Sequence, residues 1–162
     1  MQLIVHALLF CAPLSSFRLR FNHSVYWKPQ PDKANKIGED AYFSDPHLIV
    51  VADGVGGWIR VGIDSSKYSW ALCKLMASIF KKDQGSYSKN PKQLVVEAAR
   101  KNRERASATV LVGAIDSEKE ALNVANVGDC GYVILRLVAG KEREYWLGHQ
   151  SEPQQHSFNF PY

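Results

Sequence analysis

The sequence has few cysteines and lacks the motifs of several common binding sites. Only three cysteines, Cys11, Cys73 and Cys130, occur among 162 residues, and no two have CxxC spacing. This odd number argues against a disulfide framework and a zinc knuckle, and it favours a reducing compartment. The sequence also has no GxGxxG dinucleotide motif, no GxxxxGK[ST] P-loop and no HxxxH pair. We therefore expect neither a nucleotide site of these two kinds nor a histidine-rich zinc site.

A long hydrophobic run is also missing. Residues 1–17 have the apolar character of a signal peptide, but no basic residue precedes the apolar part, and Arg18 and Arg20 follow it. The run is too short and too interrupted to cross a membrane, so we expect no stable membrane insertion. Three interpretations of residues 1–17 remain open: a targeting remnant, a strand, or the product of an imperfect gene model.

Composition and charge are those of an ordinary globular protein. Apolar residues make up 46% of the chain, charged residues 22%, and the net charge is +4. A chain of 162 residues suits one domain, which we place at residues 18–162. The basic residues cluster where helices are expected to end, without interleaved aromatic residues, so we expect no nucleic-acid partner.

The order of hydrophobic patterns predicts an α+β domain. The pattern of helix spacing predicts one helix capped by Asp64 or Ser65 and ending in Lys81 and Lys82 before Gly85. A second helix is expected to start at Asn90 and Pro91 and to bury Leu94, Val95, Ala98 and Ala99. Strands are expected at residues 17–26, 41–43, 47–52, 108–115, 122–127, 132–138 and 144–147. The last four read as an antiparallel meander with both helices on one face.

Acidic residues stand at the ends of two of these expected strands. Asp53 follows the apolar run 47–52 and opens a loop with three glycines in four positions, and Glu39 and Asp40 precede the run 41–43. Adjacent strands with acids at matching ends would make a site of oxygen ligands. The glycines can adopt positive φ, which would let backbone carbonyls turn toward an ion. Taken alone, Asp53 also fits a simple Asp-Gly turn.

Several motifs in register resemble the PPM family of metal-dependent protein serine/threonine phosphatases, and most of all its branch with mitochondrial and plant members. The motifs are PDK at 31–33, GEDA at 38–41, VADGVGGW at 51–58, GID at 62–64, ANVGDCG at 125–131 and SEPQQHSFNFP at 151–161. The resemblance covers roughly residues 29–162. It implies the family's αββα sandwich, here incomplete, because the later metal-binding motifs of the family are not in this sequence.

The resemblance implies two Mg²⁺ or Mn²⁺ ions at one end of the sandwich. Asp53 would bridge them, Gly54 would offer its carbonyl, and Glu39 and Asp40 would complete the near shell. A water activated by the metal ions would then attack the phosphorus. In this sense Asp53 is the expected catalytic residue. We expect Asp129, in the GD turn, to brace the loop near the site.

A phosphate-orienting cation and a general acid are less clear from the resemblance. Lys33 or Lys36 would take the role of the family's arginine before the acidic pair, although neither matches its spacing. Val55 stands where many members of the family have a histidine, so water or another group would protonate the leaving group.

Two functions are compatible with these features. One is hydrolysis of phosphoserine and phosphothreonine in a phosphoprotein substrate by a monomer. The other is a truncated, inactive chain of the same fold that binds or regulates a partner. The cysteine usage indicates an intracellular protein, and the resemblance adds the mitochondrion as one candidate compartment.

Overall fold

The computed structural model of the chain describes residues 4–9, 19–26, 38–141, 144–157 and 160–161. Its helices are η2 (Gly56–Val61), α1 (Ser65–Lys82), α2 (Gln84–Lys89) and α3 (Pro91–Lys101). Its strands are β1 (Ile4–Leu9), β2 (Phe21–Tyr26), β3 (Asp40–Ser44), β4 (Leu48–Gly54), β5 (Ala108–Asp116), β6 (Ala121–Val127), β7 (Val133–Leu137), β8 (Tyr145–Gln150), β9 (Gln155–Ser157) and β10 (Phe160–Pro161).

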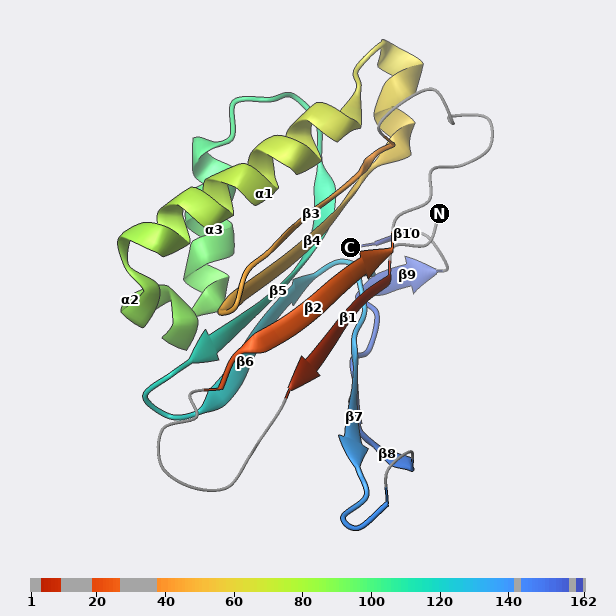
Figure 1. Cartoon of the computed structure of the whole chain (residues 1–162). Coiled ribbons are helices and arrows are strands. Elements are labelled where there is room, and N and C mark those ends of the chain that lie inside the picture. The colour runs from red at the N-terminus through yellow and green to blue at the C-terminus, as the bar shows by residue number, and fades with distance from the viewer. Residues whose placement is uncertain (1–3, 10–18, 27–37, 142–143, 158–159, 162) are drawn as a thin grey trace.

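A four-stranded antiparallel sheet in the order β3-β4-β5-β6 forms the centre of the fold. Helices α1 and α3 cover one of its faces, as Figure 1 shows. On α1, Leu72, Met76 and Phe80 recur every four residues and are buried, as are Val50 and Val112 of the sheet. The alternation of side chains along a strand therefore places one set of apolar residues under the helices.

The opposite face of the sheet packs against β2. Phe21 of β2 forms a second cluster with Ile49 of β4 and Ile115 of β5, and β2 pairs with β1 in a separate two-stranded sheet. The result is a layer of helices, a sheet, and a further layer of strands (Figure 1). This arrangement is part of an αββα sandwich, and it confirms the predicted α+β class.

Both predicted helix starts are present with their caps. The Asp64 side chain accepts a hydrogen bond from the Ser66 amide, and the Asn90 side chain accepts one from the Gln93 amide. Such caps satisfy amide groups that have no partner within the helix.

Helix α1 ends at Lys82, which confirms the end predicted from Lys81 and Lys82, although Gly85 is not its C-terminal cap. Asp83 follows α1 and accepts a hydrogen bond from the Ser86 amide, so it caps a further short helix, α2, which contains Gly85. In the second predicted helix, Leu94, Val95 and Ala98 are buried as expected, but the predicted burial of Ala99 was wrong because Ala99 is exposed.

The predicted four-stranded meander was wrong as well. Strands β5 and β6 belong to the central sheet, whereas β7 and β8 pair only with each other among the described strands. Gly128, with φ +92°, follows β6 and turns the chain out of the sheet, so β7 does not pair with β6. In Figure 1 the hairpin of β7 and β8 projects away from the helices.

The structure also bears on the interpretations of the N-terminal segment. Residues 4–9 form β1, which agrees with the strand interpretation of that segment, and the targeting interpretation stays a prediction. No helix in the described part of the chain has the length and apolar character needed to cross a membrane. Lys33, Lys36 and Cys11 lie outside the described residues.

Candidate metal centre

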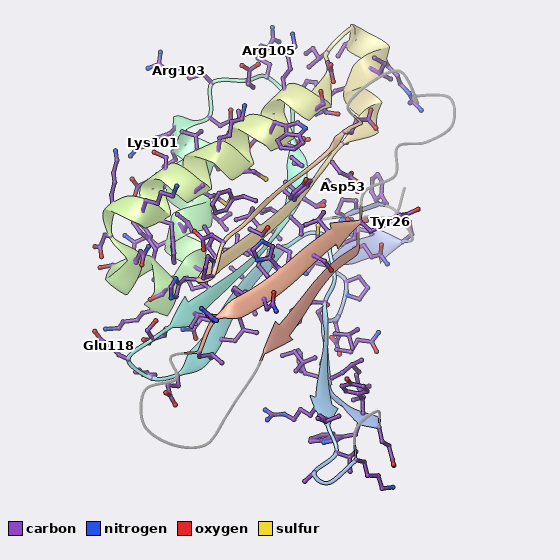
Figure 2. All side chains as sticks on the ribbon, viewed as in Figure 1. Tyr26, Asp53, Lys101, Arg103, Arg105 and Glu118 are labelled. Carbon is purple, nitrogen blue, oxygen red and sulfur yellow. The ribbon has the colours of Figure 1, made fainter. Side chains whose placement is uncertain are left out.

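Asp40 and Asp53 lie directly opposite each other at the end of the β3–β4 pair. Paired residues in an antiparallel sheet project from the same face, and a hydrogen bond joins these two carboxyl groups. Asp40 is only 3% exposed, and its Oδ1 atom has no hydrogen-bond partner within the described structure. Asp53, in contrast, reaches the surface at one end of the sheet (Figure 2). The predicted meeting of acids at matching strand ends is therefore present.

The electrostatics of this pair favour a bound positive charge. Burial raises the pKa of Asp40 to about 8, and the hydrogen bond and charge of Asp53 act in the same direction. Burial also raises the pKa of Asp53, and the charges of Asp129 and Glu39 raise it further. Two carboxyl groups this close hold a proton between them unless a cation replaces it.

The backbone of Glu39 meets the start of the glycine loop. The Gly54 amide donates a hydrogen bond to the Glu39 carbonyl (3.0 Å), and a Cβ on Gly54 would lie 2.7 Å from that oxygen. A Cβ on Gly56 would lie 3.2 Å from Oε2 of Glu39. The Glu39 carboxylate therefore lies against the loop that follows Asp53.

The expected reason for these glycines was wrong. Gly54, Gly56 and Gly57 do not have positive φ. At Gly54 the requirement is instead close approach, because a Cβ would collide with the Glu39 carbonyl, and at Gly56 a Cβ would be tightly packed against the Glu39 carboxylate. A glycine that does have positive φ is Gly38 (φ 78°), immediately before Glu39 and Asp40.

Two serines at the start of α1 contact the backbone of Glu39 and Gly54, the residues next to Asp40 and Asp53. The Ser69 hydroxyl donates to the Glu39 carbonyl at 2.6 Å, and Ser65 is buried against Gly54. The sequence analysis did not single out either residue. Their signal was two serines four residues apart on the buried face of a helix, where apolar residues are usual.

Ser107, at the entry to β5, holds the other side of the glycine loop. Its carbonyl accepts a hydrogen bond from the Val55 amide, and its hydroxyl accepts one from Nε1 of Trp58 at 2.9 Å. The loop after Asp53 is thus attached to both α1 and β5.

The GD turn after β6 adds a further acid near the pair, and the expected role of Asp129 in bracing the loop stays a prediction. Asp129 is close enough for its charge to raise the pKa of Asp53. Cys130, the next residue, contacts the Thr109 hydroxyl (Sγ–Oγ1 3.1 Å). Burial, and then the charges of Asp53, Asp129 and Asp40, raise the pKa of Cys130 to about 11. A thiol with this pKa is protonated at neutral pH and does not serve as a nucleophile.

The residues present fit a hard divalent cation in chemistry but supply only part of a ligand set. Carboxylate and carbonyl oxygens are the preferred ligands of Mg²⁺ and Mn²⁺, and the unpartnered oxygen of Asp40 is a suitable donor. Within residues that the structure describes, however, no group of three or more His, Cys, Asp or Glu side chains converges to hold a metal ion. The centre of the site is therefore the Asp40–Asp53 pair.

Comparisons with known proteins find relatives that are named as protein phosphatases. No family model matches the sequence. The chain is 32% identical over 159 residues to "Probable protein phosphatase 2C 26" of Arabidopsis thaliana, which covers 94% of this chain and 50% of that protein. It is 34% identical over 140 residues to "Protein phosphatase PTC7 homolog fig" of Drosophila grimshawi, which covers 80% of this chain and 43% of that protein.

A solved structure has a similar fold. The X-ray structure of the photosystem II phosphatase PBCP matches with a TM-score of 0.69 and 26% identity, over 99% of this chain and 54% of that one. The chain thus spans about half the length of this structure and half or less of these curated relatives.

Proposed function

The chain belongs to the PPM family of protein serine/threonine phosphatases, also called protein phosphatase 2C, and we propose that it carries part of a two-metal phosphatase site that hydrolyses phosphoserine and phosphothreonine. The observation that carries the proposal is the Asp40–Asp53 pair, buried on one side and open to solvent on the other. A phosphoprotein is the substrate class that fits the names of the relatives.

The proposed ligands come from the end of the β3–β4 pair and the residues beside it. Asp53, at the solvent-facing end of β4, would help to hold Mg²⁺ or Mn²⁺, and Asp40 would contribute its unpartnered oxygen. Glu39 and the carbonyl of Gly54 would complete the near shell. When bound, the cations would lower the pKa of a water molecule and neutralise phosphate oxygens.

The chain's own groups fix these ligands in position. The Ser69 hydroxyl and the Gly54 amide both bind the Glu39 carbonyl, so the backbone before Asp40 is held to α1 and to β4. Val55 carries no titratable group, so the proton for the leaving group would come from water or another group. Lys33 or Lys36 remains the proposed phosphate-orienting cation.

A second candidate function is an inactive PPM-fold module that binds or regulates a partner. The observation that favours it is the lack, in the described part of the chain, of a convergent group of three metal-binding side chains. Such a module would keep the fold but not turn over substrate.

Hydrolysis of an aryl phosphate by the purified chain separates the two functions. The assay compares wild type with Asp53→Asn, with and without Mn²⁺. Glu118→Gln serves as a matched control, because Glu118 is an exposed acid at the opposite end of the sheet (Figure 2). Turnover that needs Mn²⁺, is lost in Asp53→Asn and survives in Glu118→Gln supports the phosphatase. A folded wild-type chain without turnover supports the inactive module.

A further inference from the structure

The segment that follows β8 holds the GD turn through Gln154. The Gly128 amide donates to Oε1 of Gln154 (3.2 Å), and the Gln154 amide donates to the Gly128 carbonyl (3.0 Å). Nε2 of Gln154 also donates to the carbonyl of Asn126 at 3.2 Å. One glutamine thus binds the chain on both sides of Val127, where β6 ends.

A second attachment lies at the other end of the turn. The Tyr132 amide donates to the Ser151 hydroxyl (2.8 Å), and the Ser151 amide donates to the Tyr132 carbonyl (3.0 Å). Residues 151–154 therefore hold the turn at both ends, with Asp129 and Cys130 between the two attachments. Within the turn, Nδ2 of Asn126 binds the Cys130 carbonyl at 2.6 Å.

The turn that Gln154 holds is packed against the strand next to Asp53. A Cβ on Gly128 would lie 2.5 Å from Cγ2 of Thr109, so the two residues are in close contact. Thr109 also contacts the Cys130 thiol, and it is paired with Asp53 across β4 and β5. A shift of Gly128 toward Thr109 would therefore displace Thr109, and through it the end of β4.

We propose that Gln154 is a positioning residue for the Asp40–Asp53 pair. It fixes Gly128 against Thr109, and so it sets the position of Asp53 and the distance between Asp53 and Asp129. The relevance of this role to catalysis rests on the proposed phosphatase function. Gln154 touches neither carboxyl group of the pair in the described hydrogen bonds, so its effect is transmitted through the turn and β5.

The test uses Gln154→Met in the full chain, because methionine has a similar length but makes neither side-chain hydrogen bond. Gln93→Met is the matched control, since Gln93 is also exposed and its side chain makes no hydrogen bond with another described residue. Two quantities are measured: the amide signals of Thr109 and Asp53 in ¹H–¹⁵N spectra, and the affinity for Mn²⁺ by titration. Thermal unfolding gives the stability of each variant.

We expect Gln154→Met to shift the amide signals of Thr109 and Asp53 and to weaken Mn²⁺ binding by about 3- to 10-fold, somewhat less than the loss of a direct partner of a metal ligand. Gln93→Met should change neither. Unchanged signals at Thr109 and Asp53 would overturn the positioning role, whatever happens to Mn²⁺.

The two proposals fail in different ways. If wild type binds no Mn²⁺ but the signals of Thr109 and Asp53 shift in Gln154→Met, the metal site is wrong for this chain and the positioning role stands. If wild type binds Mn²⁺ and Gln154→Met binds it equally well, with or without a lower melting temperature, Gln154 braces the turn alone and its positioning role is refuted.

Discussion

Asp40 faces Asp53 across the first pair of the β3–β4 ladder, with one carboxyl group buried and the other open to solvent. Antiparallel pairing puts the two groups on the same face, and the hydrogen bond between them needs a proton. The pair therefore costs stability once both groups are ionised and no cation is present.

This arrangement predicts that the protein without metal becomes less stable as pH rises. The folded pKa of Asp40, about 8, is above its unfolded value of 3.8, so the folded state binds more protons between these values. Stability is then greatest below pH 4 as far as this group is concerned, and it is lost as pH rises toward 8. Urea unfolding at pH 5, 6, 7 and 8 in the presence of a chelator measures the trend.

Asp40→Asn is the companion variant, because an amide keeps the shape but cannot ionise. Its unfolding free energy should change less between pH 5 and pH 8 than that of wild type. A wild-type protein with constant or rising stability over this range would contradict the prediction.

Gly54 should tolerate no side chain. An alanine Cβ would lie 2.7 Å from the Glu39 carbonyl and 3.1 Å from Ser65, and both contacts are with structure that cannot easily move. We expect Gly54→Ala to lower the free energy of unfolding by about 1–3 kcal/mol, as overpacking usually does. Gly57→Ala is the control from the same loop, because its Cβ would meet nothing closer than 3.9 Å. Equal melting temperatures for the two variants would refute this steric argument.

The site shows what sequence patterns reveal and what they miss. The apolar run before Asp53 and the acids before residues 41–43 were enough to predict that Asp40 and Asp53 meet, because each marked a strand end. The sequence could not show that Ser69 binds the Glu39 carbonyl, since that bond depends on how α1 crosses the sheet. Nor could it show that Gly54 is needed for close approach and not for its φ.

The fold was predicted well where the signal is local. Asp64 and Asn90 start helices through their own side chains, and both were found correctly. The meander failed because strand pairing between distant segments depends on the turn between them. Gly128 redirects the chain after β6 through contacts with Gln154, which lies 26 residues later. Periodicity within a strand contains no information about such a contact.

Gly128 should be more sensitive to substitution than another glycine of the same φ. Alanine at Gly128 combines positive φ (92°) with a contact of 2.5 Å to Cγ2 of Thr109, whereas Gly140 has φ 79° and open space around it. Strain from φ alone costs about 1–3 kcal/mol, and overpacking adds a similar amount. Thermal unfolding should therefore rank wild type above Gly140→Ala, and Gly140→Ala above Gly128→Ala.

A second substitution identifies the cause of the Gly128 effect. Thr109→Ser removes Cγ2 and keeps the hydroxyl that contacts Cys130. Gly128→Ala with Thr109→Ser should recover only part of the lost stability, because Cβ of residue 109 would still lie 2.8 Å from the added Cβ. No recovery would mean that Cγ2 of Thr109 is not the main obstacle.

The β7–β8 hairpin should make the isolated chain prone to self-association. Leu135 and Leu147 are cross-strand partners that are 58% and 55% exposed, and Leu137 and Tyr145, also partners, are exposed on the same face. A contiguous apolar face of this kind favours association in water.

Replacing Leu135 and Leu147 with threonine, which suits a strand, should lower the associated fraction in sedimentation velocity while the circular dichroism spectrum stays the same. Val61→Thr is the control, since Val61 is 68% exposed but lies on η2, outside the hairpin. If the variant with Leu135→Thr and Leu147→Thr associates as much as wild type, the apolar face is not the cause. The edge strand β6 of the four-stranded sheet then becomes the next surface to test.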